Sequence, residues 1–240
     1  MEISIWLITA LSLLVGCWIQ TALGFGMAVF AAPIMVMIEP SWVPAVITFT
    51  ALLLSILNTW NQKQSLQVKH LLLPIVTRIP GTLIGAWLLL QLSVFWLQVC
   101  VSICVLLAVL VSYFGKQFPY TSKRLAFASF VSGITGTTTS IGGPPMALVM
   151  QHGEPKTVRA NLSFFFVYSC SVSILAYAYL GLLTSEILFM SLSLIPVCLF
   201  GFVLGKKTQA YVDAGRFRPL LLILCSCAGI IALIGAIKEF

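Results

Sequence analysis

Eight long apolar stretches follow one another along the chain, and short polar stretches between them carry most of the charged residues. The apolar stretches lie at about 3–38, 43–60, 68–90, 94–114, 125–151, 157–180, 184–205 and 217–237. An uncharged apolar run of roughly 18 residues or more is long enough for a helix to cross the hydrocarbon core of a bilayer. Soluble domains do not repeat such runs. The pattern therefore predicts an all-α polytopic membrane protein.

Composition supports this fold class and excludes several functions. Hydrophobic residues make up 60% of the 240 residues and charged residues only 8%, whereas ordinary soluble domains carry about 25% charged residues. Little of the chain is left for a soluble domain or a nucleic-acid-binding surface. The seven cysteines and two histidines lack the spacing of zinc ligands, and no nucleophile–base pair is apparent. The sequence predicts no enzyme, no catalytic residue, no metal site and no cofactor.

Two of the apolar stretches are interrupted by glycines and small polar residues. The first interruption runs from Cys17 to Gly26, and the second runs from Gly133 to Pro145 with five hydroxyl side chains. Backbone at membrane depth must satisfy its hydrogen bonds, so such a break persists only inside protein or beside a watery cavity. Two breaks at matching places in two halves indicate the substrate site of a transporter that is built from repeats.

Three short patterns recur in the same order with nearly the same spacing. The pairs are Glu39-Pro40 and Glu154-Pro155, Ile79-Pro80 and Ile195-Pro196, and Gly26 and Gly143, at offsets of 115, 116 and 117 residues. Together they indicate duplication of a unit of about 116 residues. We expect a single transmembrane transport domain that consists of an N-terminal repeat, 1–116, and a C-terminal repeat, 117–240.

The lysines and arginines indicate how the broken stretches cross the membrane. If both cross fully, the loop charges divide six to six between the two faces. If both turn back, one face holds eleven of the 13 lysines and arginines: Lys63, Lys69, Lys116, Lys123, Arg124, Lys156, Arg159, Lys206, Lys207, Arg216 and Arg218. Because positive charge accumulates on the cytoplasmic side, this asymmetry favours two inverted repeats. Each repeat is expected to hold a glycine-broken re-entrant or broken helix plus three transmembrane helices, with both termini outside the cytoplasm.

The chain resembles the TauE/SafE sulfite exporter family. The resemblance rests on the Gly24-Phe25-Gly26 break, the Thr/Ser-rich break that closes in Gly142-Gly143-Pro144-Pro145, and the length of 240 residues. It covers essentially the whole chain. It implies a secondary transporter in the bacterial cytoplasmic (inner) membrane that moves a small sulfur-containing anion, such as sulfite or sulfoacetate, with export as the expected direction. The alternatives are an importer of another small anion, such as thiosulfate or a carboxylate, and a membrane protein that does not transport.

The expected partners follow from the same two sources. The chain should meet a small anionic substrate and membrane lipid, with protons as the candidate coupling ion and a homodimer as the candidate assembly. No nucleic acid is expected.

Residues at the two breaks are the candidate binding residues. Glycines let backbone N–H groups approach a ligand, and the N-terminus of a half-helix favours an oxyanion. The candidate substrate-binding residues are Gln20, Thr21, Gly24, Gly26, Arg78, Thr137, Thr138, Thr139, Ser140, Gly142 and Gly143. The alternative is that the hydroxyls bond to their own helix and that the glycines only permit tight packing.

Arg78 is the candidate that carries a full charge. It lies about ten residues into 68–90, just before Pro80. A charge inside a membrane span is costly and is a functional hypothesis by default. The alternative is that its side chain reaches the interface near Lys69. Its counterpart in the second repeat is Leu194, so the duplication does not require a charge here.

Glu39 and Glu154 occupy equivalent positions in the two repeats, and each precedes a proline. A polar residue followed by proline after an apolar run predicts a helix boundary. The alternative role for these carboxylates is proton coupling.

Overall fold

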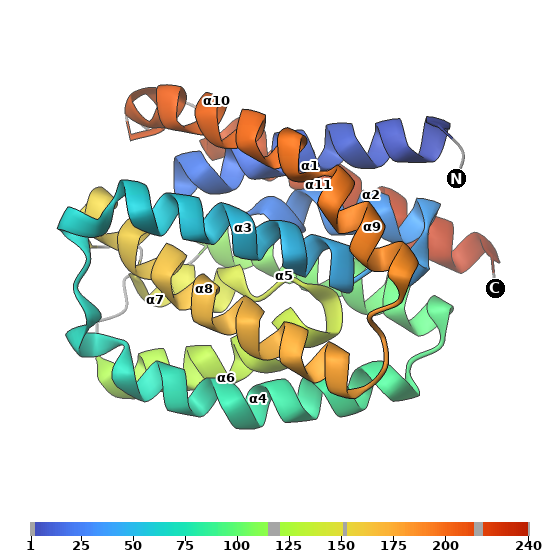
Figure 1. The fold of residues 1–240 in the computed structure, drawn as a ribbon, viewed down its shortest axis with the longest axis horizontal. Helices are drawn as coiled ribbons and strands as arrows, with labels where there is room; N and C mark the ends of the chain where they lie inside the picture. Colours follow the sequence, from blue (N-terminus) through green and yellow to red (C-terminus); the bar gives the residue numbers. More distant parts are fainter. Residues whose placement is uncertain (1–2, 115–120, 151–152, 214–217, 240) are drawn as a thin grey trace.

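The structure is a computed structural model that describes residues 3–114, 121–150, 153–213 and 218–239. Over these residues the chain is helical and contains no strand (Figure 1), which confirms the predicted all-α fold class. The α-helices follow the predicted apolar stretches in order. They are α1 (Ile3–Leu23), α2 (Met27–Ile38), α3 (Ala45–Asn61), α4 (Leu72–Gln91), α5 (Val94–Phe114), α6 (Ser122–Thr139), α7 (Gly143–Met150), α8 (Pro155–Tyr179), α9 (Ser185–Ser193), α10 (Ile195–Asp213) and α11 (Arg218–Glu239).

Several helices have the length and composition of membrane spans. Four stretches within the described ranges qualify: Ile3–Leu23, Leu72–Gln91, Pro155–Tyr179 and Ser185–Tyr211, the last of which combines α9 with most of α10. About 20 apolar residues are needed to cross the hydrocarbon core as a helix. The chain is therefore suited to cross a membrane several times.

Helix α4 carries its apolar side chains on the outside and its polar ones on the inside. Its inner face buries Arg78 and Thr82 together with two glycines. Its outer face is exposed and apolar at a spacing of three to four residues: Leu72, Val76, Ile79, Leu83 and Trp87. A helix in water has the opposite arrangement. The arrangement of α4 therefore fits lipid on its outer face and polar chemistry within the bundle.

The first broken stretch forms a helical hairpin. Helix α1 ends at Leu23, and the chain passes through Gly24 and Gly26 with φ of 94° and 116°. Only glycine adopts such angles readily. Met27, the first residue of α2, lies beside the middle of α1, where its Sδ is 3.6 Å from the Cys17 thiol. Helix α2 therefore turns back along α1 instead of continuing it, as Figure 1 also shows.

The second broken stretch has the same form. Helix α6 ends at Thr139, and Ser140 adopts a left-handed φ of 64°. The Ser132 hydroxyl, inside α6, donates a hydrogen bond of 2.6 Å to the carbonyl of Gly142. This contact brings the start of α7 back against α6.

Each hairpin packs closely against a helix of the other half. Between α4 and α6, a Cβ added at Gly81 would clash with the carbonyl oxygen of Phe130, so the two backbones touch. Between α1 and α10, a Cβ at Gly205 would lie 2.5 Å from the Cβ of Thr21. Small residues permit such close approach between membrane helices.

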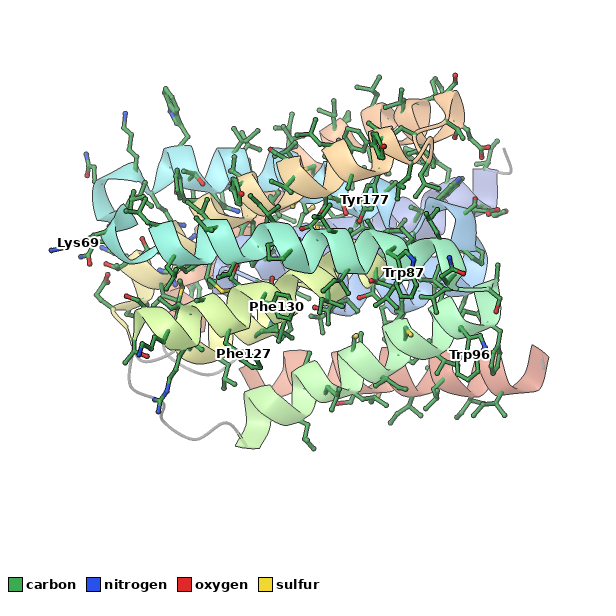
Figure 2. The ribbon with its side chains drawn as sticks, turned by 90° about the horizontal axis from the view of Figure 1, so that it is seen from below. Lys69, Trp87, Trp96, Phe127, Phe130 and Tyr177 are labelled. Atoms are coloured by element: carbon green, nitrogen blue, oxygen red, sulfur yellow. The ribbon has the colours of Figure 1, made fainter. Side chains whose placement is uncertain are left out.

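The two ends of the bundle differ in what they contain. Helix α1 begins and α11 ends at one end, where the α4–α5 and α8–α9 turns also lie (Figure 1). The α3–α4 connection lies at the opposite end, together with the start of α6 and the end of α10. Lys69 projects at that opposite end, whereas Trp87 and Trp96 lie toward the first (Figure 2). Lys63, in the α3–α4 connection, and Lys123, in the first turn of α6, also belong to that opposite end, which we call the lysine-rich end. Tryptophan lies at both ends, since Trp60 contacts Lys63, as is usual at the two interfaces of a bilayer.

The two glutamates that precede prolines cap helices. Glu154 accepts hydrogen bonds from the backbone N–H groups of Thr157, at 2.7 Å, and Lys156, at 3.1 Å, at the start of α8. These bonds, that from Thr157 first, lower the pKa of the Glu154 carboxyl. Glu39 accepts from the N–H and hydroxyl of Ser41 beside α2. Both glutamates thus stand at helix boundaries, as the sequence pattern predicts.

Candidate functional site

The two breaks meet at one cavity in the interior of the bundle. Its walls come from both halves of the chain: Gln20, Gly26, Met27, Ala28, Val29, Thr48, Ala51, Arg78, Gly136, Ser140, Ile141, Gly142, Gly143, Phe166, Ser169, Cys170 and Ser173. The space open to the centre of a water molecule is about 40 Å³, where one ordered water needs roughly 10–15 Å³. The cavity therefore has room for an ion of a few heavy atoms.

The first break presents a helix N-terminus to this cavity. Gly26 precedes α2, and the N–H of Phe30 is the first to bond back, to the carbonyl of Gly26 at 3.2 Å. The N–H groups of Met27, Ala28 and Val29 consequently have no partner within α2. All three residues line the cavity. The positive end of the α2 dipole thus faces it.

The second break closes the opposite wall. The Ser140 hydroxyl donates to the carbonyl of Pro44 at 2.8 Å and lies 3.2 Å from the Thr48 hydroxyl. Helix α7 begins at Gly143, and a Cβ there would lie 3.1 Å from the Cβ of Phe25. The tips of the two hairpins therefore contact each other. The prolines that follow Gly143 have no N–H, so α7 offers fewer backbone donors than α2.

Arg78 is the only arginine among the residues that line the cavity. Its side chain is 2% exposed. Nη1 donates to the Ser132 hydroxyl at 3.0 Å and Nη2 donates to the Ser173 hydroxyl at 3.1 Å. Nε is buried and has no protein partner. Figure 2 shows α4, the helix that carries Arg78, running along the length of the molecule away from Lys69, which precedes it.

The charge of Arg78 has no counter-ion among the side chains that the structure describes. The groups that interact with it electrostatically are Cys170, Tyr177 and Tyr168, and none is a carboxylate. A buried charge that lacks an opposite charge costs several kcal/mol. The buried guanidinium of Arg78, beside two hydroxyls and a cavity, can therefore accommodate an anion as its counter-ion.

A chain of hydroxyls holds the guanidinium in place. Ser173 lies 3.0 Å from the Thr137 hydroxyl while it accepts from Arg78. The hydroxyl of Tyr177 donates to the carbonyl of Thr137 at 2.7 Å. These bonds tie α4, α6 and α8 together around the charge.

Six of the eleven predicted site residues line the cavity: Gln20, Gly26, Arg78, Ser140, Gly142 and Gly143. They include both breaks and the charged residue. The structure therefore brings together residues that lie up to 123 positions apart in the sequence. The reach of Arg78 to the cavity follows from its place on the inner face of α4.

The other five predicted residues do not line it. Thr138 donates to the carbonyls of Gly85 and Ile134, and Thr139 donates to that of Thr135, so these two hydroxyls bond to helix backbone. Hydroxyls that bond to helix backbone instead of to a ligand are the alternative that the sequence left open for these residues. Thr137 is not a lining residue, but its hydroxyl lies 3.0 Å from that of Ser173, which lines the cavity.

Thr21 and Gly24 also lie outside the cavity wall. The Thr21 hydroxyl accepts from the Asn58 amide at 3.3 Å. A Cβ at Gly24 would lie 3.1 Å from Cγ of Arg159, at the start of α8. Both residues therefore pack the hairpin against its neighbours.

Sequence reasoning missed Ser132 and Ser173, which accept hydrogen bonds from Arg78, and Ser169, which lines the cavity. Ser132 lies one turn before Gly136, and Ser169 and Ser173 are four residues apart, so they share a face of α8. Polar residues at i and i+4 in an apolar helix are a signal that would have found them. No group of three or more His, Cys, Asp or Glu that could hold a metal lies within the described part of the chain.

Comparison with known families supports a membrane transporter. Residues 8–232 match the family described as Sulfite exporter TauE/SafE. No curated protein and no solved structure matches the chain. The match spans nearly the full length, so it includes both breaks and every residue that lines the cavity. The chain therefore belongs to the TauE/SafE sulfite exporter family, as its glycine-rich breaks predict, and is a multi-pass membrane transport protein.

Proposed function

We propose that the protein is a secondary transporter that exports a small sulfur-containing anion, such as sulfite or sulfoacetate, across the bacterial cytoplasmic membrane. The observation that carries this proposal is the buried guanidinium of Arg78 in a cavity between two broken helices. A bound anion would offset the cost of burying that charge. Family membership supports a sulfur anion as the cargo.

The donors around the cavity suit a compact oxyanion. Arg78 offers N–H groups in a planar fork, and α2 offers backbone N–H groups. The Ser140 hydroxyl can donate to an anion when its proton turns from the Pro44 carbonyl, which also accepts from Thr48 at 3.0 Å. An oxyanion with three oxygens can accept from all three directions at once. Separation of the hairpin tips would break the contact between Phe25 and Gly143 and widen the cavity, which Gly143 lines.

We further propose that the two halves are inverted repeats. One support is a pair of equivalent helix contacts: Gly85 touches Gly133, and Gly201 touches Cys17. An offset of 116 residues converts Gly85 to Gly201 and Cys17 to Gly133. In the first contact Gly85 comes from the N-terminal half, and in the second contact its equivalent, Gly201, comes from the C-terminal half. A twofold axis that relates the two halves produces such an exchange of equivalent residues.

A second support lies within each half. The Thr137 hydroxyl lies 3.0 Å from that of Ser173, and the Thr21 hydroxyl lies 3.3 Å from the Asn58 amide. Offsets of 116 and 115 relate the two pairs. Because α1 and α6 begin at opposite ends of the bundle (Figure 1), the two units run in opposite directions.

Labelling of cysteines tests the orientation of these repeats. In Gln64→Cys the new thiol lies in the α3–α4 connection and should be protected from an impermeant reagent outside intact cells, because the lysine-rich end is cytoplasmic. In Gln91→Cys the thiol lies at the opposite end and should be labelled. Both positions are exposed, so burial does not explain a difference. Labelling of Gln64→Cys from outside would overturn the orientation.

Single hydroxyl substitutions test which residues touch the anion. Ser140→Ala removes a cavity-lining hydroxyl that can donate to the anion when its proton turns from the Pro44 carbonyl. A hydrogen bond to a charged group contributes about 1.5–3 kcal/mol. We expect sulfite affinity to fall by about 10-fold or more, since tenfold corresponds to 1.4 kcal/mol. Thr139→Ala is the matched control, because Thr139 does not line the cavity and its hydroxyl bonds to the carbonyl of Thr135. Isothermal titration of the purified variants measures both affinities, and equal losses would contradict this assignment.

Transport itself is measured in proteoliposomes. Flux of sulfite, sulfoacetate, thiosulfate and acetate, each with and without a pH gradient, compares the cargo classes and tests protons as the coupling ion. We expect the sulfur oxyanions to move and the pH gradient to alter their rate. Flux of acetate with none of the sulfur oxyanions would overturn the proposed cargo.

A further inference from the structure

A polar stripe runs along α3 from the cavity to the end of the helix. Ser55, Asn58, Thr59 and Gln62, at its C-terminal cap, are its members, and we call them the α3 stripe. At about 100° per residue they lie within an arc of roughly 100° on one face of the helix. Thr48 and Ala51, which line the cavity, lie on the same face. The stripe therefore continues the cavity wall.

The α3 stripe faces the first hairpin. The Asn58 amide donates to the Thr21 hydroxyl at 3.3 Å, and the Gln20 amide lies 3.5 Å from the Ser55 hydroxyl. Gln20 itself lines the cavity. The path from the cavity into the stripe is thus polar at its first step and passes between α1 and α3.

Unpaired polar atoms are concentrated in this stripe. Within the described residues, eight buried side-chain nitrogen or oxygen atoms have no protein partner. Four of the eight belong to the stripe: Asn58 Oδ1, Thr59 Oγ1, Gln62 Oε1 and Gln62 Nε2. Asn58 is only 1% exposed. A buried polar group without a hydrogen-bond partner costs about 1–3 kcal/mol. Four such atoms in one stripe therefore indicate that the stripe binds polar molecules.

The chemistry of these atoms favours water and a hydrated anion over a bound cation. A bare cation is held by acceptor oxygens alone. Here the stripe offers hydroxyl and amide donors as well as acceptors, and Gln62 leaves one of each unpaired. Water and oxyanions use such mixed surfaces.

The length of the stripe matches half a membrane. From Ala51, in the cavity wall, to Gln62 is eleven residues, or about 16 Å of helix at 1.5 Å per residue. Half of the hydrocarbon core is about 15 Å. The stripe ends beside Lys63, at the lysine-rich end of the bundle (Figure 1).

We propose that the α3 stripe is one wall of a hydrated passage through which the anion moves between the cavity and the lysine-rich end. The opposite wall is the C-terminal half of α1, with Gln20 and Thr21. The inference rests on the proposed function for the identity of the cargo, but the passage itself is defined by the polar atoms. It gives Thr21 and Gln20 a role along the path of the anion.

Cysteine accessibility tests the passage. Asn58→Cys and Gln62→Cys place thiols in the stripe, and Ile56→Cys, at a 46% exposed apolar position, places one on another face of α3. The probe is the membrane-impermeant anion 2-sulfonatoethyl methanethiosulfonate, applied to each side of membrane vesicles. Peptide mapping locates each adduct, so the native cysteines do not interfere. We expect adducts at 58 and 62 from the lysine-rich side and none at 56, which faces lipid.

Protection of the thiol at 58 by an anion tests the proposed cargo separately from the passage. Sulfoacetate, which does not consume the probe as sulfite does, should slow labelling at 58. Labelling without protection by any sulfur oxyanion supports the passage and overturns the proposed cargo. Absence of labelling at both 58 and 62 from either side overturns the passage.

A second measurement covers the case in which Asn58→Cys does not fold. Gln62→Leu makes the end of the stripe apolar, at a partly exposed position where the change is tolerated more easily. We expect flux to fall about tenfold, which is a barrier increase of 1.4 kcal/mol, with an unchanged dissociation constant at the cavity. Unchanged flux in Gln62→Leu would overturn the passage.

Discussion

Arg78→Met is expected to abolish anion binding while the protein remains folded. Removing one partner of a buried, hydrogen-bonded charge pair costs about 2–5 kcal/mol of binding free energy. Sulfite affinity should therefore fall by about 30-fold or more, because each 1.4 kcal/mol is tenfold. Without ligand, the variant should be as stable as the original protein or more so, since an apolar side chain of similar size replaces a buried charge that has no counter-ion.

Two measurements with opposite expected signs make this prediction specific. Isothermal titration gives the affinity, and thermal unfolding without anion gives the stability. Arg124→Met is the matched control, because Arg124 is exposed in the first turn of α6, and neither quantity should change there. Wild-type affinity in Arg78→Met would place the anion elsewhere. A large loss of stability would make the Arg78 charge a structural element.

Gly26→Val is expected to abolish flux. Gly26 has φ of 116°, where a β-branched residue is strained, and its Cβ would lie 2.9 Å from Cγ2 of Ile19. A left-handed conformation costs an ordinary residue roughly 1–2 kcal/mol. The added methyl groups would also cover the start of α2, whose N–H groups face the cavity. Flux in proteoliposomes and thermal unfolding together record the two effects.

Two other glycines separate strain from occlusion. Gly181 has φ of 70° and nothing within 4 Å of an added Cβ, so Gly181→Val introduces strain away from the cavity and should retain flux. Gly143 lines the cavity, and its Cβ would lie 3.1 Å from Cβ of Phe25, so Gly143→Val should block flux by occlusion. If Gly26→Val and Gly143→Val both fold and transport sulfur oxyanions at normal rates, the site lies elsewhere.

Much of the fold could be predicted because it depends on local pattern. Apolar runs of the length of a bilayer mark the helices, and Gly24 and Gly26 mark a break because only glycine takes their φ angles without strain. The loop charges favour hairpins over straight spans, and α2 and α7 do turn back. These features depend on residues that are close in sequence, so their physical causes can be read from the sequence.

The tertiary structure decided which hydroxyls line the cavity and which bond to backbone. In the sequence, the four consecutive hydroxyl residues from Thr137 to Ser140 are equivalent candidates for anion ligands. In the structure, Ser140 lines the cavity, whereas Thr138 and Thr139 bond to helix backbone. Which hydroxyl turns inward depends on where α6 ends and on the left-handed φ of Ser140. A pattern of residue types does not specify that rotation.

The depth of Arg78 was decided in the same way. Sequence alone leaves it between the interface and the cavity, because a long side chain can reach either. Close packing of Gly81 and Gly85 against α6 brings α4 near enough for the guanidinium to reach Ser132 and Ser173. The sequence by itself determined the helices, their breaks and the charge asymmetry. Only the tertiary structure decided which polar groups meet, because a contact between distant segments depends on the distance and rotation of packed helices.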